Sequence, residues 1–210
     1  MKRLVPAFPA ILTLVLVLLA ACVPVAAPAA APSPAPPTPA PAADLVAPAK
    51  AFVAAMNAGN VDAALALFAE DTRLDAFGSP ARGKEASRAV LDWLVAREVQ
   101  QQIADCRPQA DRVACTASYA DGCSAASGLP SDWSMKLVFV YQPDGKIKQA
   151  FLSHEAPLPE DVGSFWMEWL DWVRANRSGD LYKVNEDDGE GGKLLVKLCR
   201  EYAATLTAGN

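Results

Sequence analysis

The residues able to do chemistry in this chain are few and widely spaced. The chain holds one histidine, His154, and five cysteines among its 210 residues. A single histidine excludes zinc sites built from several histidines and argues against a Ser-His-Asp triad. No two cysteines have the Cys-x-x-Cys spacing, which argues against a metal held by thiolates. We therefore expect no metal and no cofactor, and we look to the carboxylates for any acid–base chemistry.

The composition narrows the classes of protein that remain. Hydrophobic residues make up 52% of the chain and charged residues 20%, which is enough for a packed core in one ordinary domain or two small ones. The 19 Lys and Arg residues are outnumbered by 24 Asp and Glu residues, so the net charge is −5. Nucleic-acid binding requires a concentrated basic face. We therefore expect no nucleic-acid partner.

The N-terminus is typical of an export signal. Two basic residues follow Met1, an apolar run covers residues 10–19, and no charged residue occurs from residue 4 to residue 43. The sequence Leu-Ala-Ala-Cys that ends at Cys22 resembles the bacterial lipobox. That resemblance implies a signal peptide over residues 1–21 and a diacylglyceryl group on the Cys22 thiol. The alternatives are an uncleaved membrane helix, disfavoured by the short apolar run, and an ordinary signal-peptidase cut without lipid.

A proline-rich segment follows the predicted signal. Residues 23–42 contain eight prolines and eight alanines, so they have no apolar face to bury and cannot form a continuous helix. We expect residues 22–44 to be a linker of polyproline type. The predicted mature protein is thus extracytoplasmic and attached to the cell membrane through its lipid, so that the membrane is one partner.

From residue 45 onward the patterns predict helices and then strands. Helical periodicity covers residues 46–57, 61–68 and 83–94. Between the last two we expect a short strand over 72–77 and a turn at 78–80. Four further strands are expected near 98–106, 112–121, 133–142 and 145–154. A helix rich in tryptophan begins after Pro157, an acidic loop covers 185–192, and a last helix starts at Lys193. This order predicts the α+β class.

Two stretches carry a family resemblance. The helical pair from Phe52 to Asp71 and the Gly83-Lys84-Glu85-Ala86 entry to the next helix resemble the nuclear transport factor 2-like superfamily, and its SnoaL-like group in particular. The resemblance covers residues 45–156. It implies a cone-shaped, curved antiparallel sheet wrapped around three N-terminal helices, with a pocket at the wide end. Residues 157–210 then form an additional C-terminal helical extension.

The four cysteines after Cys22 predict two disulfides, since an even number in an exported chain favours pairing. A turn centred on residues 110–111 places Cys106 opposite Cys115 in adjacent antiparallel strands, within reach of a disulfide. Cys123 is then left for Cys199, which would attach the last helix to the sheet.

Strict alternation along the strands predicts which side chains line the pocket. This alternation predicts that His154 points away from the pocket. It does not decide whether the Cys106–Cys115 pair lies on the inner or the outer face of the sheet. If the cysteine pair lies on the outer face, Asp105 points inward, and the apolar Val99 and Ile103 favour this arrangement. If the pair lies on the inner face, Tyr119 and Asp121 point into the pocket instead. The predicted ligand-binding residues are Trp133, Leu137, Phe139, Tyr141, Gln149 and Phe151.

Two hypotheses about function follow. In the first, the tethered domain binds a small apolar ligand or a partner protein without catalysis, because no complete set of acid and base residues is present. In the second, the domain is an isomerase, dehydratase or hydrolase that uses Asp75 or Asp105 as its base, as the SnoaL-like resemblance implies. The same resemblance implies a homodimer formed through the sheet, unless the C-terminal helices cover that surface.

Overall fold

The computed structural model describes residues 44–130, 133–155, 157, 160–186 and 188–208. The predicted signal peptide, the lipidated Cys22 and nearly all of the predicted linker lie outside the described residues. In the ranges that are described, no helix is both long and apolar enough to cross a bilayer. The elements below all belong to the compact unit Pro41–Asn210.

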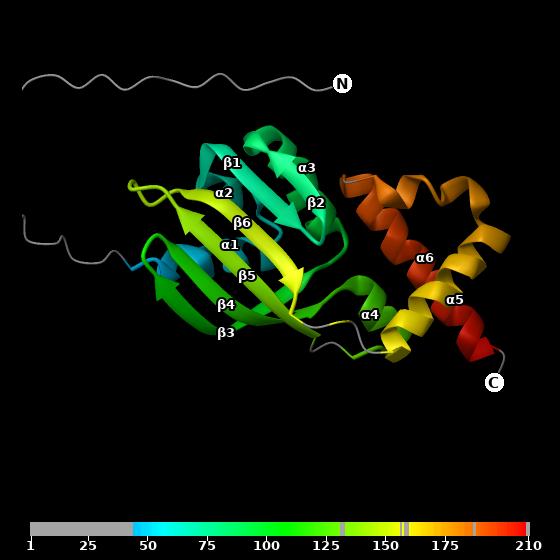
Figure 1. Cartoon of the computed structure of the whole chain (residues 1–210). Helices are drawn as coiled ribbons and strands as arrows, with labels where there is room; N and C mark the ends of the chain where they lie inside the picture. The colour runs from blue at the N-terminus through cyan, green and yellow to red at the C-terminus, as the bar shows by residue number, and fades with distance from the viewer. Residues whose placement is uncertain (1–43, 131–132, 156, 158–159, 187, 209–210) are drawn as a thin grey trace, which may run out of the picture. The chain divides into compact units, whose positions relative to one another are not determined.

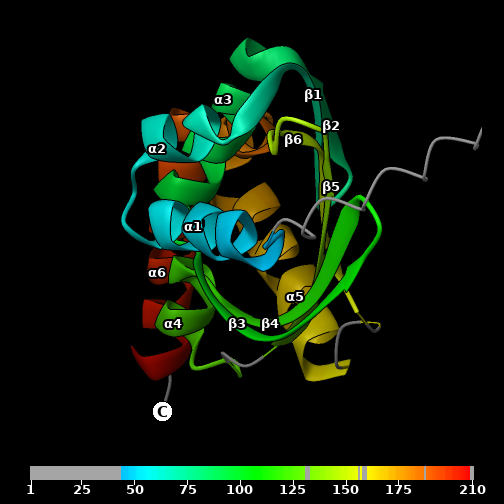
Figure 2. The ribbon, with the colours of Figure 1, turned by 90° about the vertical axis from the view of Figure 1, so that its left-hand side faces the viewer.

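Three helices precede or interrupt the first strands. They are α1 (Val46–Asn57), α2 (Val61–Ala66) and α3 (Gly83–Ala96). The Asn60 side chain accepts a hydrogen bond of 3.0 Å from the Ala63 backbone N–H and so caps α2. Gly59, just after the end of α1, has φ +67°, a left-handed conformation that commonly terminates a helix. The three helices lie along the concave side of the sheet, as Figure 2 shows.

The sheet has six strands in the order β2-β1-β6-β5-β4-β3 and is curved (Figure 1). β1 pairs with β6 in parallel, whereas every other neighbouring pair is antiparallel, so the sheet is mixed. The predicted turn at 78–80 is shorter than expected, because β2 already begins at Ser79. The strands are β1 (Phe68–Ala76), β2 (Ser79–Arg82), β3 (Gln100–Gln109), β4 (Arg112–Ala120), β5 (Trp133–Tyr141) and β6 (Ile147–His154).

A β-bulge in β3 changes which residues face the helices. Ala104 is an extra residue between positions that pair with consecutive residues of β4. Gln101 before the bulge and Cys106 after it therefore both face the inner side, where Gln101 is buried and Cys106 packs on the core. The favoured prediction for the disulfide face was wrong: Cys115 and Tyr119 are buried on the inner side, and Asp105 is exposed.

A second bulge has the same effect in β6. Lys148 is the extra residue, because Gln149 and Ile147 pair with neighbouring positions of β5. Beyond it, Ala150 is buried and His154 lies on the same inner face, whereas Gln149 and Phe151 lie on the outer face. The orientation predicted for Gln149, Phe151 and His154 was therefore wrong, since it assumed unbroken alternation.

The chain after β4 and β6 builds a second, smaller core. α4 (Gly122–Ser127), which the sequence did not predict, precedes β5, and α5 (Glu160–Asn176) and α6 (Gly189–Ala208) follow β6, with the short 3-10 turns η1 (Ser178–Asp180) and η2 (Lys183–Asn185) between them. α6 begins inside the stretch predicted as an acidic loop. Its Gly192 is required by close packing, since a Cβ there would lie 2.6 Å from the Trp93 carbonyl oxygen.

Both predicted disulfides are confirmed. Cys106 and Cys115 are directly paired residues of β3 and β4. Cys123 of α4 is joined to Cys199 of α6, and both residues are completely buried in the second core. Disulfides persist in oxidising compartments, so this pair of cross-links points to a location outside the cytoplasm.

Candidate functional site

A pocket of about 300 Å³ lies where the inner face of the sheet meets the C-terminal helices. One side is formed by the ends of β4, β5 and β6 together with the β1–β2 turn. The other side is formed by α5, α6 and the turn between them. The lining residues are Phe77, Tyr119, Trp133 and His154 on the sheet side, Arg97 just after α3, and Trp166, Trp169, Leu170, Val184 and Leu195 on the helical side.

Aromatic rings form most of the sheet side of this pocket. Tyr119 stacks on Trp133 with ring centroids 5.8 Å apart, and Phe77 meets Tyr119 edge-on at 5.4 Å. The His154 ring lies 5.0 Å from that of Phe77. Phe77 has φ +54°, a conformation that bulky residues rarely adopt. Its ring is thus held against the pocket by a turn geometry that a glycine would adopt more easily.

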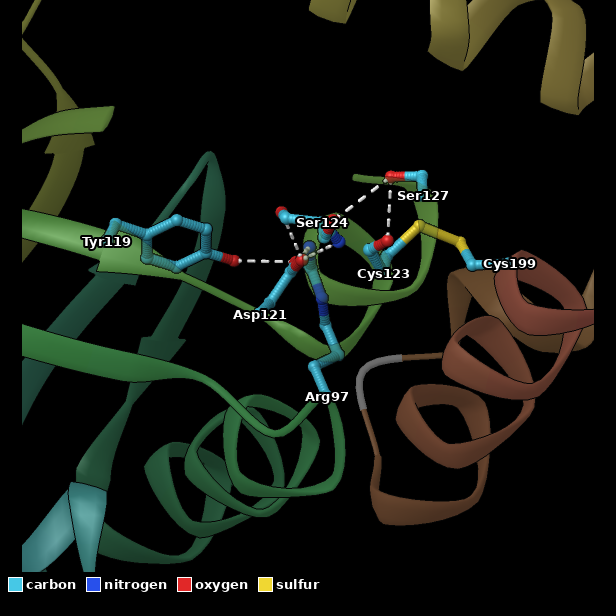
Figure 3. Close-up of a disulfide and its surroundings, with 7 residues drawn as sticks. All are labelled: Arg97, Tyr119, Asp121, Cys123, Ser124, Ser127 and Cys199. Atoms are coloured by element: carbon cyan, nitrogen blue, oxygen red, sulfur yellow. Dashed lines mark hydrogen bonds and ion pairs between the residues drawn. A yellow bond between two sulfur atoms is a disulfide. The ribbon is translucent and has the colours of Figure 1, made fainter. Parts of the chain in front are cut away.

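A buried polar network supports the wall behind these rings. Figure 3 shows Arg97 and Tyr119 converging on Asp121. The Arg97 guanidinium forms an ion pair with Asp121 Oδ2, and the Tyr119 hydroxyl donates to the same oxygen at 3.0 Å. Asp121 Oδ1 accepts hydrogen bonds from the Ser124 backbone N–H at 2.9 Å and from its hydroxyl at 2.7 Å, which caps α4.

The charges in this network are set by its geometry. Burial by itself raises the pKa of the Asp121 carboxyl, but the Arg97 charge and the hydrogen bonds from Ser124 outweigh burial and lower it. Asp121 is therefore ionised at neutral pH. Burial raises the pKa of the Tyr119 phenol far above its ordinary value, so Tyr119 stays protonated.

His154 is the titratable group on the sheet side whose charge changes nearest to neutral pH. Partial burial, and next the positive charge of Arg97, lower its pKa below the ordinary value of 6.5. The imidazole is therefore neutral at pH 7. Within the described part of the chain its Nδ1 atom has no hydrogen-bond partner.

Part of the chain matches the model of a known protein family. Residues 49–150 match the family model of the SnoaL-like domain. The match supports a SnoaL-like domain. The predicted span 45–156 contains all the matched residues, and no curated protein matched the sequence at a significant level.

Several solved structures are similar to the SnoaL-like part of the chain. A SnoaL-like protein of unknown function from Burkholderia thailandensis is 19% identical, with a TM-score of 0.46, and the alignment covers 56% of this chain and all of that one, 100%. A nuclear transport factor 2-like protein of unknown function from Cytophaga hutchinsonii is 11% identical, with a TM-score of 0.44, and the alignment covers 53% of this chain and 89% of that one. An uncharacterised cystatin-fold protein from Novosphingobium aromaticivorans is 24% identical, with a TM-score of 0.45, and the alignment covers 51% of this chain and 96% of that one.

Much of the pocket lies outside the matched SnoaL-like residues. His154 and the whole helical side, from Trp166 to Leu195, come after residue 150. Trp166 and Trp169 of α5 meet edge-on at 5.4 Å, which continues the aromatic lining across the pocket. The C-terminal extension therefore supplies one wall of the pocket.

The predicted ligand-binding residues are divided among three places. Trp133 lines the pocket. Leu137 and Phe139 are completely buried in the main core, and Tyr141 is buried at the opposite end of β5, where burial raises the pKa of its phenol. Gln149 and Phe151 lie on the outer face of the sheet, where the Arg73 guanidinium lies 5.9 Å from the Phe151 ring centroid.

The two candidate catalytic carboxylates do not line the pocket. Asp105 is exposed and forms an ion pair with Arg107 at 3.2 Å. Asp75 points away from the core residues Leu74 and Ala76 and lies 4.0 Å from Arg73. Among the described residues, no group of histidine, cysteine and carboxylate side chains could hold a metal ion.

Sequence reasoning missed several residues that line or support the pocket. Arg97 had no recognisable motif, and His154 was placed by an alternation that a bulge interrupts. Asp121 was named only in the alternative with the Cys106–Cys115 pair on the inner face, which is the arrangement found. Trp166 and Trp169 did have a signal, because their helical spacing was evident. In the structure this stripe packs in the second core and also forms the second wall of the pocket.

Proposed function

We propose that this protein is an exported, lipid-anchored binding protein whose SnoaL-like domain holds a small apolar, aromatic molecule without transforming it. The pocket between the sheet and α5 carries this proposal, because it is lined by aromatic rings on both sides. Its volume of about 300 Å³ lies at the lower end of the range for ligand pockets, which suits a molecule of two or three fused rings.

The polar atoms behind the pocket wall argue against catalysis. Asp121 contacts the lining residues Arg97 and Tyr119, and both of its oxygens already accept hydrogen bonds from Arg97, Tyr119 and Ser124. A carboxylate with a lowered pKa and occupied lone pairs is a poor general base. Asp75 and Asp105, which the enzymatic alternative required, lie on the other face of the sheet.

The anchor is supported by the lipobox-like sequence at Cys22 and by the two disulfides. The Ala/Pro-rich linker would then hold the binding domain clear of the bilayer. Labelling with a palmitate analogue tests this part: the native chain should be labelled and the Cys22→Ser variant should not. A variant that is still labelled would contradict the anchor. Dimerisation through the outer sheet face stays a prediction.

Native mass spectrometry of the full chain purified from its own host tests the binding function. We expect a non-covalent small molecule on the native protein that is lost in Trp133→Ala. Trp172→Ala is the matched control, because Trp172 lies on α5 against Tyr202 and does not line the pocket. The proposal fails if the native protein carries no ligand and binds no aromatic probe, or if both variants lose the ligand equally.

A further inference from the structure

Phe77 occupies a backbone conformation that its residue type disfavours. It forms a two-residue turn with Gly78 between β1 and β2, because Ala76 pairs with Ser79. Phe77 has φ +54° and Gly78 has φ +87°, and a hairpin turn whose two central residues both have positive φ strongly prefers Asn-Gly. A bulky side chain at the first of these positions therefore costs stability that asparagine or glycine would not.

Two other non-glycine residues in the described part of the chain have a positive φ, and each differs from Phe77 in its side chain. Glu98, with φ +59°, accepts two hydrogen bonds of 2.7 Å from the Arg200 guanidinium and so ties its turn to α6. Ala110, with φ +52° in the turn between β3 and β4, carries only a methyl group. Phe77 has neither a charge to pair nor a small side chain, so the contacts of its ring must account for its presence.

The ring of Phe77 lies at the pocket. It meets the Tyr119 ring edge-on at 5.4 Å and lies 5.0 Å from the His154 ring. The Phe77 backbone N–H donates a hydrogen bond of 2.9 Å to the Leu152 carbonyl oxygen, which fixes the turn against β6. Phe77 is half-buried, whereas Tyr119 and Trp133 are only 2% and 8% exposed. Of these three aromatic residues, Phe77 therefore keeps the most surface available to a ligand.

We infer that Phe77, held in this turn, is a specificity-determining residue that makes the pocket prefer aromatic over saturated ring systems. The inference rests on the binding function proposed above. Contacts between aromatic rings stabilise beyond the area they bury, because the negative face of one ring attracts the positive edge of another. A saturated ring system on the same carbon skeleton buries a similar area on Phe77 and lacks this attraction.

The competing explanation is that the Phe77 ring serves only to cover Tyr119 and His154. A cover of this kind stabilises the fold by burying apolar surface. Its replacement would then change the affinities for aromatic and saturated ligands by the same factor. The ratio of the two affinities therefore separates a specificity-determining role from a structural one.

Two probes with one carbon skeleton measure that ratio. They are 2-naphthalenemethanol and decahydro-2-naphthalenemethanol, titrated by calorimetry against the full chain carrying Cys22→Ser to avoid detergent. Phe77→Leu keeps an apolar side chain and removes the ring, so the preference for the aromatic probe should fall about fivefold. Phe151→Leu is the matched control, because Phe151 is also half-buried but lies on the outer face, away from the pocket. It should leave the preference unchanged.

A second pair of variants tests the turn that holds the ring. Phe77→Ala and Phe77→Gly both remove the ring, but only glycine also removes the cost of the positive φ. The glycine variant should melt about 2–4 °C above the alanine variant, and both should bind the aromatic probe equally weakly. Ala110→Gly should raise the melting temperature of the otherwise native chain by a similar amount and leave binding unchanged, since Ala110 does not line the pocket.

The outcomes separate the two claims. If neither probe binds the native chain, the proposed binding function fails and this inference falls with it. If both probes bind and Phe77→Leu keeps the native ratio of affinities, the binding function stands and the inference is overturned. A glycine variant that melts no higher than the alanine variant would show that the turn does not hold Phe77 at a positive φ, which also overturns the inference.

Discussion

Two aromatic groups lie on the inner side of the sheet and have opposite roles. At one end, which we call the core end, Phe52, Phe68 and Phe139 are completely buried and pack ring against ring at 5.4–5.6 Å. At the other, the pocket end, Phe77 and Trp133 line an open space with His154. The core end is filled by α1 and α2 of the SnoaL-like part, whereas the pocket end is bounded by the C-terminal extension.

This difference shows how one sheet serves both stability and binding. Where a helix packs directly on the sheet, the aromatic side chains interdigitate and leave no space. Where the covering element is a separate core, the rings still contact one another, but a pocket remains beside them and polar side chains are among its lining. Changes at the core end should therefore act on folding, and changes at the pocket end on binding.

The largest expected effect concerns the cross-link that holds the helical wall. Removing the Cys123–Cys199 disulfide, whose cysteines are 76 positions apart, with a double Cys→Ala variant should lower the free energy of unfolding by about 4–5 kcal/mol. The same change at Cys106 and Cys115, 9 positions apart, should lower it by about 3 kcal/mol. Urea denaturation measures both.

Binding should separate these two variants further. Loss of Cys123–Cys199 frees α6 from α4 and should weaken binding of aromatic probes under conditions where the variant is still folded. Loss of Cys106–Cys115 should leave the helical wall in place and binding nearly intact. Equal effects of the two variants on binding would contradict the role assigned to the extension.

A truncation at each end tests the comparison directly. Phe139→Ala leaves a closed cavity at the core end and should destabilise the fold by about 3–5 kcal/mol without changing the affinity of the folded protein. Trp133→Ala enlarges a space that is already open, so it should destabilise the fold less and abolish most of the binding. Denaturation and calorimetry on both variants provide the readout. A loss of affinity in Phe139→Ala that equals that of Trp133→Ala would show that the two ends are not separate.

How much of this was predictable depends on the strand. In β5 alternation is unbroken, and the predicted inward residues Trp133, Leu137, Phe139 and Tyr141 are all buried. In β3 and β6 a single extra residue reverses the faces, and no local pattern in the sequence indicates where a bulge falls. The disulfides were predictable because the turn between β3 and β4 fixed the pairing of Cys106 with Cys115 on the correct side of the bulge.

The pocket itself was less accessible to sequence reasoning. Its two walls come from segments far apart in the chain, and the position of α5 across the pocket from Trp133 depends on how the extension packs. The tryptophan stripe of α5 indicated an apolar face but not which surface it meets. Arg97 and Asp121 meet only because α3 ends beside the end of β4.

The smallest expected effect is a pH dependence that belongs to the pocket end. Because the pKa of His154 is lower in the folded protein than its ordinary value of 6.5, the unfolded chain binds this proton more readily. The contribution to the free energy of unfolding is therefore fully present above about pH 6.5, and it is lost as the pH falls through the pKa of the folded protein. Arg97 faces His154 as the charged group that opposes its protonation, while the neighbouring Tyr119 stays neutral.

Melting temperatures between pH 8 and pH 5 test this sign when the protein is compared with His154→Gln. We expect the native chain to lose more stability than the variant over this interval, because only the native chain carries the His154 imidazole, and the lowered pKa of Asp121 keeps that carboxylate ionised. Equal slopes would mean that His154 has the same proton affinity folded and unfolded, as it would on the outer face that unbroken alternation predicts. The measurement thus also tests the bulge at Lys148, which places His154 on the inner face of the sheet, where the Arg97 charge acts on it.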